Sequence, residues 1–264
     1  MHLADSHSWA VRITLCFAFA LASATAHGEE TAGHEFADFL LIPLRVHLLT
    51  AADAPNVATT LSDKDIDRIL LKIIAVWAQA GIHFWLESRV REEATNSAGF
   101  AEAETLRPGS RLLALRPDAS KTDRALHLYY IKSMLSNGIH FPPAMFVKDT
   151  AALREVSGGI DEPLPRVSSH EIGHALGLPH RQDTTNLMAS GTTGTTLNAA
   201  EIATARAAAQ KLTCMRTAAV VLQIADEAWT TDDRYRAREL YRQLITLPVT
   251  FDGFDRIKQR AAGE

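Results

Sequence analysis

In residues 39–50, FLLIPLRVHLLT, every second residue from Ile42 to Leu48 is apolar. Because alternate side chains of a β-strand point to the same face, this pattern predicts a half-buried strand. The segment that follows repeats its apolar residues at helical spacing, and Ser62 with Asp65 three residues later is typical of a helix start. Gly81 ends this helix, and a second strand is predicted over 82–90. A helix between two strands favours a βαβ unit with parallel pairing.

Two more strands are predicted further along the chain. Residues 125–134, ALHLYYIKSM, form the third strand, after a polar segment that is expected to be mostly irregular. The fourth run, 144–147, follows Pro142 and Pro143. Proline has no N–H to donate to a neighbouring strand, so we expect the strand 144–147 to lie at an edge of the sheet.

The second half of the chain carries mainly helical patterns. One helix is expected to begin after Asp161 and to end at Gly177, the residue type that most often follows a helix. Asn198 precedes a second helical segment and is a typical N-cap. Two further amphipathic helices are predicted at 218–229 and 232–245.

Composition and charge are ordinary for a globular protein. The chain has 264 residues, of which 47% are hydrophobic and 22% charged. This length allows one large domain, or one domain with an appendage. The formal net charge of −4 shows no basic excess, which argues against a nucleic-acid partner.

The N-terminal residues resemble an export signal. Arg12 precedes an apolar run, residues 13–24, that is too short to span a bilayer comfortably. The run ends at Ala24-Thr25-Ala26, which fits the small-x-small pattern of a signal-peptidase site. The alternative is a first core helix, but the residues that follow are polar and include glycine. We therefore expect a signal peptide at 1–26 and a secreted or periplasmic protein without stable membrane insertion after cleavage.

The sequence HEIGHALGLPH contains the residues of a metal site. His170 and His174 are one helical turn apart, so both imidazoles lie on one face. Glu171 lies beside them without being needed as a ligand, and Gly177 lets the chain turn so that His180 can become the third ligand. Three protein ligands leave a position for water, as in catalytic zinc sites. The full spacing would occur in about one in ten thousand shuffled chains.

The pattern H-E-x-x-H-x-x-G-x-x-H at residues 170–180 resembles the signature of the metzincin zinc proteases. Met188 lies where metzincins carry a methionine-containing turn beneath the zinc. The order of predicted elements from about Phe39 to Leu212 is also similar to that of a metzincin catalytic domain. The resemblance implies an α+β (α/β-like) fold with a twisted mixed sheet, an edge strand, an active-site helix and C-terminal helices.

Two departures locate the chain within that group. Arg181 follows the third histidine, where matrixins commonly have serine. No tyrosine follows Met188, so the extra tyrosine ligand of astacins and serralysins is missing. The chain resembles most closely the matrixin-like secreted proteins of bacteria.

The resemblance implies a zinc-dependent endopeptidase. His170, His174 and His180 would hold Zn2+, and Glu171 would act as general base in peptide-bond hydrolysis. Gly177 and Met188 would support the site. The partner would be a protein or peptide substrate, which would add as an antiparallel strand to the predicted edge strand. The residues of that strand are Ala144, Met145, Phe146 and Val147.

The catalytic domain is expected to span 27–212, with a C-terminal helical extension at 213–264. Two other functions stay open. One is zinc-dependent hydrolysis of another amide, such as a cell-wall crosslink, and the other is a catalytically silent metal-binding recognition module. The intact Glu171 argues against the silent module, because metal binding alone does not need it. The sequence does not indicate an oligomeric state.

Four other histidines need an interpretation. His47, His83 and His127 lie in predicted strands, where a histidine is usually a packing residue with satisfied polar atoms. His140 lies close to the predicted substrate edge and is expected to face solvent.

Overall fold

The computed structural model describes residues 33–102 and 109–263. The predicted signal peptide at 1–26 lies outside the described residues. In the part of the chain that is described, no helix is long and apolar enough to cross a membrane.

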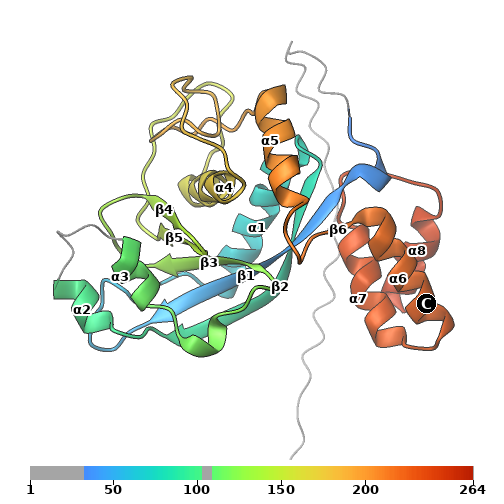
Figure 1. The fold of residues 1–264 in the computed structure, drawn as a ribbon, viewed down its shortest axis with the longest axis horizontal. Helices are drawn as coiled ribbons and strands as arrows, with labels where there is room; N and C mark the ends of the chain where they lie inside the picture. Colours follow the sequence, from blue (N-terminus) through green and yellow to red (C-terminus); the bar gives the residue numbers. More distant parts are fainter. Residues whose placement is uncertain (1–32, 103–108, 264) are drawn as a thin grey trace, which may run out of the picture. The chain divides into compact units, whose positions relative to one another are not determined.

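A mixed β-sheet forms the centre of the fold, with five strands in the spatial order β2-β1-β3-β5-β4 (Figure 1). β2, β1, β3 and β5 are parallel, and β4 is antiparallel to β5. A short sixth strand pairs antiparallel with the start of β1. The strands are β1 (Leu40–Thr50), β2 (Ile82–Glu93), β3 (Leu126–Ile131), β4 (Gly138–Phe141), β5 (Ala144–Lys148) and β6 (Arg216–Thr217).

The predicted βαβ unit is confirmed. Helix α1 (Asp63–Ala78) connects β1 to β2, and the two strands pair in parallel with Leu40 opposite Ile82. The Ser62 side chain accepts a hydrogen bond from the backbone N–H of Asp65, whose carboxylate accepts one from the N–H of Ser62. This reciprocal cap begins the helix where the sequence predicted it. Its buried face consists of Ile66, Ile69, Ile73, Val76 and Trp77.

Alternate residues of β3 pack into two different cores, because successive side chains of a strand point to opposite faces. Leu128 and Tyr130 share a core with α1 and with α4 (Pro163–Ala175). Tyr129 and Ile131 pack on the other face of the sheet. That face is covered by the segment that we expected to be mostly irregular, which contains α2 (Ser97–Glu102), α3 (Gly109–Ala114) and the 3-10 turn η2 (Asp118–Ser120).

The prediction of the edge strand was wrong. The strand Ala144–Lys148, which contains Ala144, Met145, Phe146 and Val147, is paired on both sides, with β3 and with β4. The edge is β4, Gly138–Phe141. Pro142 and Pro143 lie in the turn between these two strands, so their missing donors remove no bond from β5. The buried run of β5 is instead typical of an interior strand covered on both faces.

Three helices follow α5 (Ala199–Ala209) and β6: α6 (Ala218–Thr230), α7 (Arg234–Leu244) and α8 (Phe254–Ala262). The first two were predicted. The third was not, since it buries only Ile257 and Ala261. Together the three helices form a hydrophobic core with Phe39 and Leu41. Figure 1 shows the helices beside the start of β1. The C-terminal helices therefore pack on the sheet rather than forming a separate body.

Candidate active site

Helix α4 carries the first two histidines and is buried along most of its length. Pro163 lies in its first turn, where the missing N–H breaks no helical bond. At the other end, Gly177 has φ +81, its N–H donates to the carbonyl of His174 at 3.0 Å, and the N–H of Leu178 donates to the carbonyl of Gly173 at 2.9 Å. This pair of bonds is a Schellman cap, which reverses the chain so that His180 returns to the helix.

Three imidazole rings meet at the end of this turn. The Nε2 atom of His174 lies 3.1 Å from Nε2 of His170 and 3.1 Å from Nε2 of His180. One ligand atom from each of the three residues lies within 4.8 Å of the others. Two nitrogen ligands of a tetrahedral zinc ion are separated by about 3.3 Å. The observed spacing therefore fits such an ion.

The hydrogen bonds of the rings determine which nitrogen atoms are free. Nδ1 of His170 lies 2.8 Å from the carbonyl of Leu187, and Nδ1 of His174 lies 2.8 Å from the carbonyl of Leu178. A carbonyl only accepts, so each Nδ1 carries the proton and each Nε2 presents a lone pair. At His170 the shorter contact decides this, because Nδ1 also lies 3.3 Å from Nη1 of Arg166, which is a donor. Lone pairs facing one another at this distance repel unless a cation lies between them. The donor set therefore fits a metal ion.

Burial keeps His170 and His174 neutral. It lowers the pKa of His170 to about 3 and also lowers the pKa of His174. The carbonyl of Leu187 opposes the effect at His170, while the charge of Arg166 adds to it. A neutral imidazole is the form that binds a metal.

Glu171 lies in the same cleft as the three histidines, a cavity of about 620 Å³. The residue is 4% exposed, and burial raises the pKa of its carboxyl to about 8, against the opposing effects of the His140 backbone N–H and of Arg166. The carboxyl belongs to no ion pair among the described residues. Without a cation nearby, the carboxyl is therefore mostly protonated at neutral pH, and a positive charge held by the three histidines would lower its pKa and favour the carboxylate.

The edge strand passes close to this carboxyl because it begins with a glycine. A Cβ atom at Gly138 would lie 2.6 Å from Oε1 of Glu171 and 2.6 Å from Cγ1 of Val167. Any larger residue would force β4 or the side chains of Glu171 and Val167 to move. His140, two residues on, lines the cleft and is half-buried, so the expectation that it faces solvent was only partly right.

Met188 lies beneath the helix and is fully buried. Its Sδ atom occupies the space next to Gly173, where a Cβ atom would approach to 2.5 Å. The carbonyl of Met188 accepts a hydrogen bond from the N–H of Arg181 at 3.0 Å. The methionine turn is thereby tied to the residue that follows His180.

Arg166 was not identified from the sequence. It lies one helical turn before His170 and is 2% exposed. Its guanidinium donates to the carbonyl of Gly194 at 3.1 Å and to the carbonyls of Ala189 and Asn186. Burial lowers its pKa to about 10, so it stays charged at neutral pH. The side chain fastens α4 to the loop that contains Met188, and only its position in the helix, in line with His170, offered a sequence signal.

Glu201 is the second residue that the sequence did not assign to the site. It belongs to the cap of α5 and is 1% exposed. Its carboxylate accepts from Nε of Arg181 at 2.6 Å and from Nδ2 of Asn186 at 2.8 Å. It therefore holds both ends of the segment between His180 and the methionine turn. The capping pattern was visible in the sequence, but these two partners were not.

The three histidines expected to be packing residues are buried, as predicted, but Nδ1 of His83 has no hydrogen-bond partner among the described residues. His47 and His127 contact each other at 2.9 Å between Nε2 and Nδ1, and His47 also bonds to Glu92. His83 bonds to Thr246 at 3.1 Å. None of these three joins the metal-binding cluster.

A fold with a mixed sheet, an antiparallel edge strand and three histidines converging from a helix and its following turn defines a metzincin-type protein. The model of the matrixin family matches residues 55–208, which is more than half of the chain. The chain belongs to the matrixin family of zinc-dependent peptidases. The match includes α1, strands β2 to β5, α4 and most of α5. No individual curated protein matches the chain.

Proposed function

We propose that this chain is a zinc-dependent endopeptidase. The observation that carries the proposal is the convergence of three Nε2 atoms, two of them with their lone pairs fixed by Nδ1–carbonyl bonds, beside a buried glutamate in an open cleft. His170, His174 and His180 are the proposed ligands. Zinc, when bound, supplies a Lewis acid that polarises a carbonyl group and lowers the pKa of water.

The remaining chemistry belongs to Glu171. Its carboxylate is the group that accepts a proton from the attacking water and returns it to the leaving amine. The cleft holds no other carboxylate among its described lining residues. The backbone N–H of His140 fixes the orientation of the Glu171 carboxyl. Gly177 and Met188 act as structural support, through the turn and through packing under α4.

We propose that a peptide substrate pairs antiparallel with β4 rather than with β5. β4 lies at the edge of the sheet, and His140 and Gly138 place this strand directly against the cleft. An edge strand has unpaired backbone groups that an extended peptide can use. On its other side, β4 is paired with β5.

The domain organisation and location complete the proposal. We propose a signal peptide at 1–26, a catalytic domain at 27–212, and a C-terminal extension at 213–264. The mature protein is then secreted or periplasmic. N-terminal sequencing of protein exported by cells that express the full chain tests the cleavage site, which is expected after Ala26.

Hydrolysis of peptides and of cell-wall material distinguishes the three candidate functions. We expect the zinc-loaded protein to cleave internal bonds of peptides, to lose this activity with a chelator, and to regain it with zinc. Cleavage of cell-wall crosslinks alone would favour the amide hydrolase, and metal binding without any hydrolysis would favour the recognition module. Glu239→Gln, on the surface of α7, serves as the control for protein handling.

A further inference from the structure

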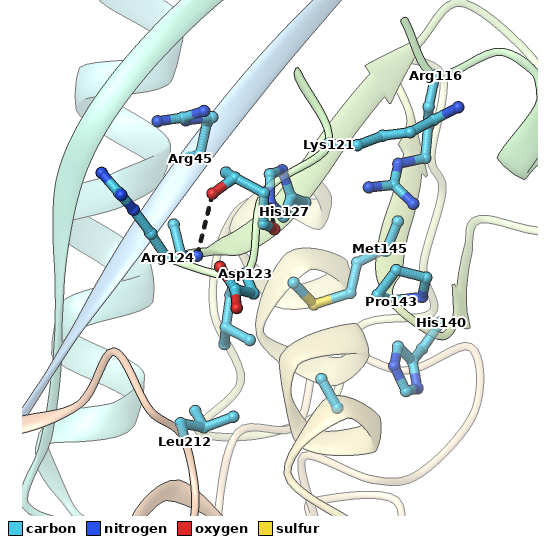
Figure 2. Close-up of a pocket in the computed structure, with 15 residues that line it drawn as sticks. Arg45, Arg116, Lys121, Asp123, Arg124, His127, His140, Pro143, Met145 and Leu212 are labelled. Atoms are coloured by element: carbon cyan, nitrogen blue, oxygen red, sulfur yellow. Dashed lines mark hydrogen bonds between the residues drawn. The ribbon is translucent and has the colours of Figure 1, made fainter. Parts of the chain in front are cut away.

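A second cavity lies next to the cleft that contains Glu171 and the three histidines. It has a volume of about 1070 Å³ and shares His140 with the cleft, and Ala175 at the end of α4 also lines it. Its walls come from the residues before and at the start of β3 and from the turn between β4 and β5 (Figure 2). We call it the basic groove, because Arg45, Arg116, Lys121 and Arg124 line it and Asp123 is its one acidic lining residue among the described residues.

Two of the four cations are already neutralised. Arg45 forms a two-bond ion pair with Glu87, at 2.7 and 2.8 Å, and Lys121 pairs with Asp118 at 2.5 Å. The positive charge that is left for a ligand therefore resides on Arg116 and Arg124.

Arg116 is the anchor of the basic groove. The residue is 5% exposed, and Nε donates to the hydroxyl of Tyr129 at 3.0 Å, with the guanidinium carbon 5.6 Å from the ring centre. Figure 2 shows its guanidinium pointing into the groove beside His127 and Met145. Arg116 forms no ion pair with any carboxylate that the structure describes. A buried guanidinium without a counter-ion is unfavourable, and a ligand carboxylate reaching it would form a strong, charge-assisted bond.

The neighbouring side chains do not neutralise the positive charge of Arg116. His127 donates to the carbonyl of Thr122 at 2.7 Å, and burial lowers its pKa to about 4, so it adds no charge at neutral pH. Arg124 is exposed at the mouth of the groove. The groove thus has a buried positive charge at its wall and a second one at its entrance.

The position of the basic groove relative to β4 indicates which part of a substrate reaches it. β4 runs from Gly138, next to Glu171, to Phe141, and the groove begins at His140 and Pro143. A peptide antiparallel to β4 runs in the opposite direction. Its residues on the N-terminal side of the bond at Glu171 therefore lie toward the groove.

We propose that the basic groove selects substrates with an acidic side chain on the N-terminal side of the cleaved bond, through Arg116 and Arg124. This inference rests on the proposed peptidase function and on pairing with β4. The chemistry required of the ligand is a carboxylate on an extended peptide.

The test uses peptide pairs that differ only in Glu or Gln, placed at each of several positions in the N-terminal half. With the zinc-loaded protein, kcat/KM for the best Glu peptide is expected to exceed that of its Gln partner by about tenfold, the effect of one charge-assisted bond. Arg124→Glu and Arg116→Gln are expected to remove the preference. Arg236→Glu, an exposed arginine on α7 with the same charge change as Arg124→Glu, is expected to keep it.

Binding provides a readout that does not need hydrolysis. The same labelled peptides are titrated into the Glu171→Gln protein. Fluorescence anisotropy is expected to show that the Glu peptide binds more tightly than its Gln partner, and adding Arg124→Glu is expected to abolish this difference. Hydrolysis without any Glu preference would overturn the role of the groove and leave the peptidase proposal intact. Selective binding of the Glu peptide, together with no hydrolysis by the zinc-loaded wild-type protein, would support a carboxylate site in the basic groove and overturn the peptidase proposal. Absence of both would overturn both.

Discussion

Gly173 and Met188 fit together so closely that a single methyl group on the glycine would collide with the methionine sulfur. A Cβ atom at Gly173 would lie 2.5 Å from Sδ and 3.1 Å from Cε of Met188. Gly173 lies in α4 between the two histidines of the helix. The absence of a side chain there is what lets the methionine turn pack directly beneath the proposed zinc ligands.

Gly173→Ala is therefore expected to destabilise the protein by about 1–3 kcal/mol, as overpacking of a core does. In an unconstrained helix the same change would stabilise by up to about 1 kcal/mol, so the sign of the effect is informative. Urea denaturation measures it. Gly99→Ala in α2, where nothing lies within 4 Å of the added atom, is the control and is expected to be neutral or stabilising. An unchanged or raised stability for Gly173→Ala would contradict the packing described for Met188.

Arg166→Met is expected to cost about 2–4 kcal/mol of stability and to weaken zinc binding. The substitution keeps an unbranched side chain but leaves the buried carbonyls of Gly194 and Ala189 without their arginine donor, while the carbonyl of Asn186 keeps the N–H of Ala189. Denaturation and metal titration check the two effects. Arg154→Met, an exposed arginine, is the comparison. Arg166 would be ruled out as the link between α4 and the methionine turn if both variants behaved alike.

Glu201→Ala is expected to lower zinc affinity by about 10- to 100-fold, as the loss of supporting groups around metal ligands does. Without this carboxylate, Arg181 and Asn186 lose their partner, and the segment that carries His180 is held less firmly. Competition with a chromophoric chelator measures the affinity. Glu239→Ala on α7 controls for the loss of a carboxylate, and equal affinities in the two variants would show that Glu201 only caps α5.

Acid is expected to destabilise the protein between about pH 6.5 and pH 4. Burial lowers the pKa of His83 and of His127 to about 4 in the folded protein. An unfolded histidine has a pKa of about 6.5, so across this range the unfolded state binds more protons, and the free energy of unfolding falls as the pH falls. Below about pH 4 these two residues contribute no further loss.

His83→Leu isolates one of these contributions. Denaturation midpoints are measured across the pH range with a chelator present, so that release of zinc does not contribute. The variant is expected to lose less stability than the wild type on going from pH 6.5 to pH 4.5. The same dependence of stability on pH in both proteins would mean that the pKa of His83 is not lowered in the folded protein.

Strong local patterns made the central part of the fold predictable. The helical spacing from Ile66 to Trp77 and the reciprocal cap at Ser62 are local, so α1 and its flanking strands followed from the sequence. β4 did not, because its four residues are too few to show a period and only pairing with β5 defines them. The edge was therefore assigned to 144–147, because Pro142 and Pro143 precede that run and cannot donate to a neighbouring strand.

The candidate site likewise has local features, which the sequence predicts, and long-range contacts, which it does not. The spacing of His170, His174 and His180 is local and predicts their convergence. Arg166 and Glu201 act through partners that lie 15 to 28 residues away, and those bonds depend on the folded loop. Gly138 and Gly173 are needed because side chains from other parts of the sequence pack directly against them. The residues around a glycine do not reveal such contacts.

The most direct test of the proposed mechanism is peptide hydrolysis by Glu171→Gln, measured together with its zinc content. Glutamine keeps the size of the side chain but accepts no proton from water at neutral pH. We predict one zinc ion per chain and a fall in kcat/KM of at least about a hundredfold, the lower end expected for loss of a general base. A zinc-loaded variant that keeps most of the wild-type activity would contradict the assignment of Glu171, and a wild-type protein that binds no zinc would contradict the account as a whole.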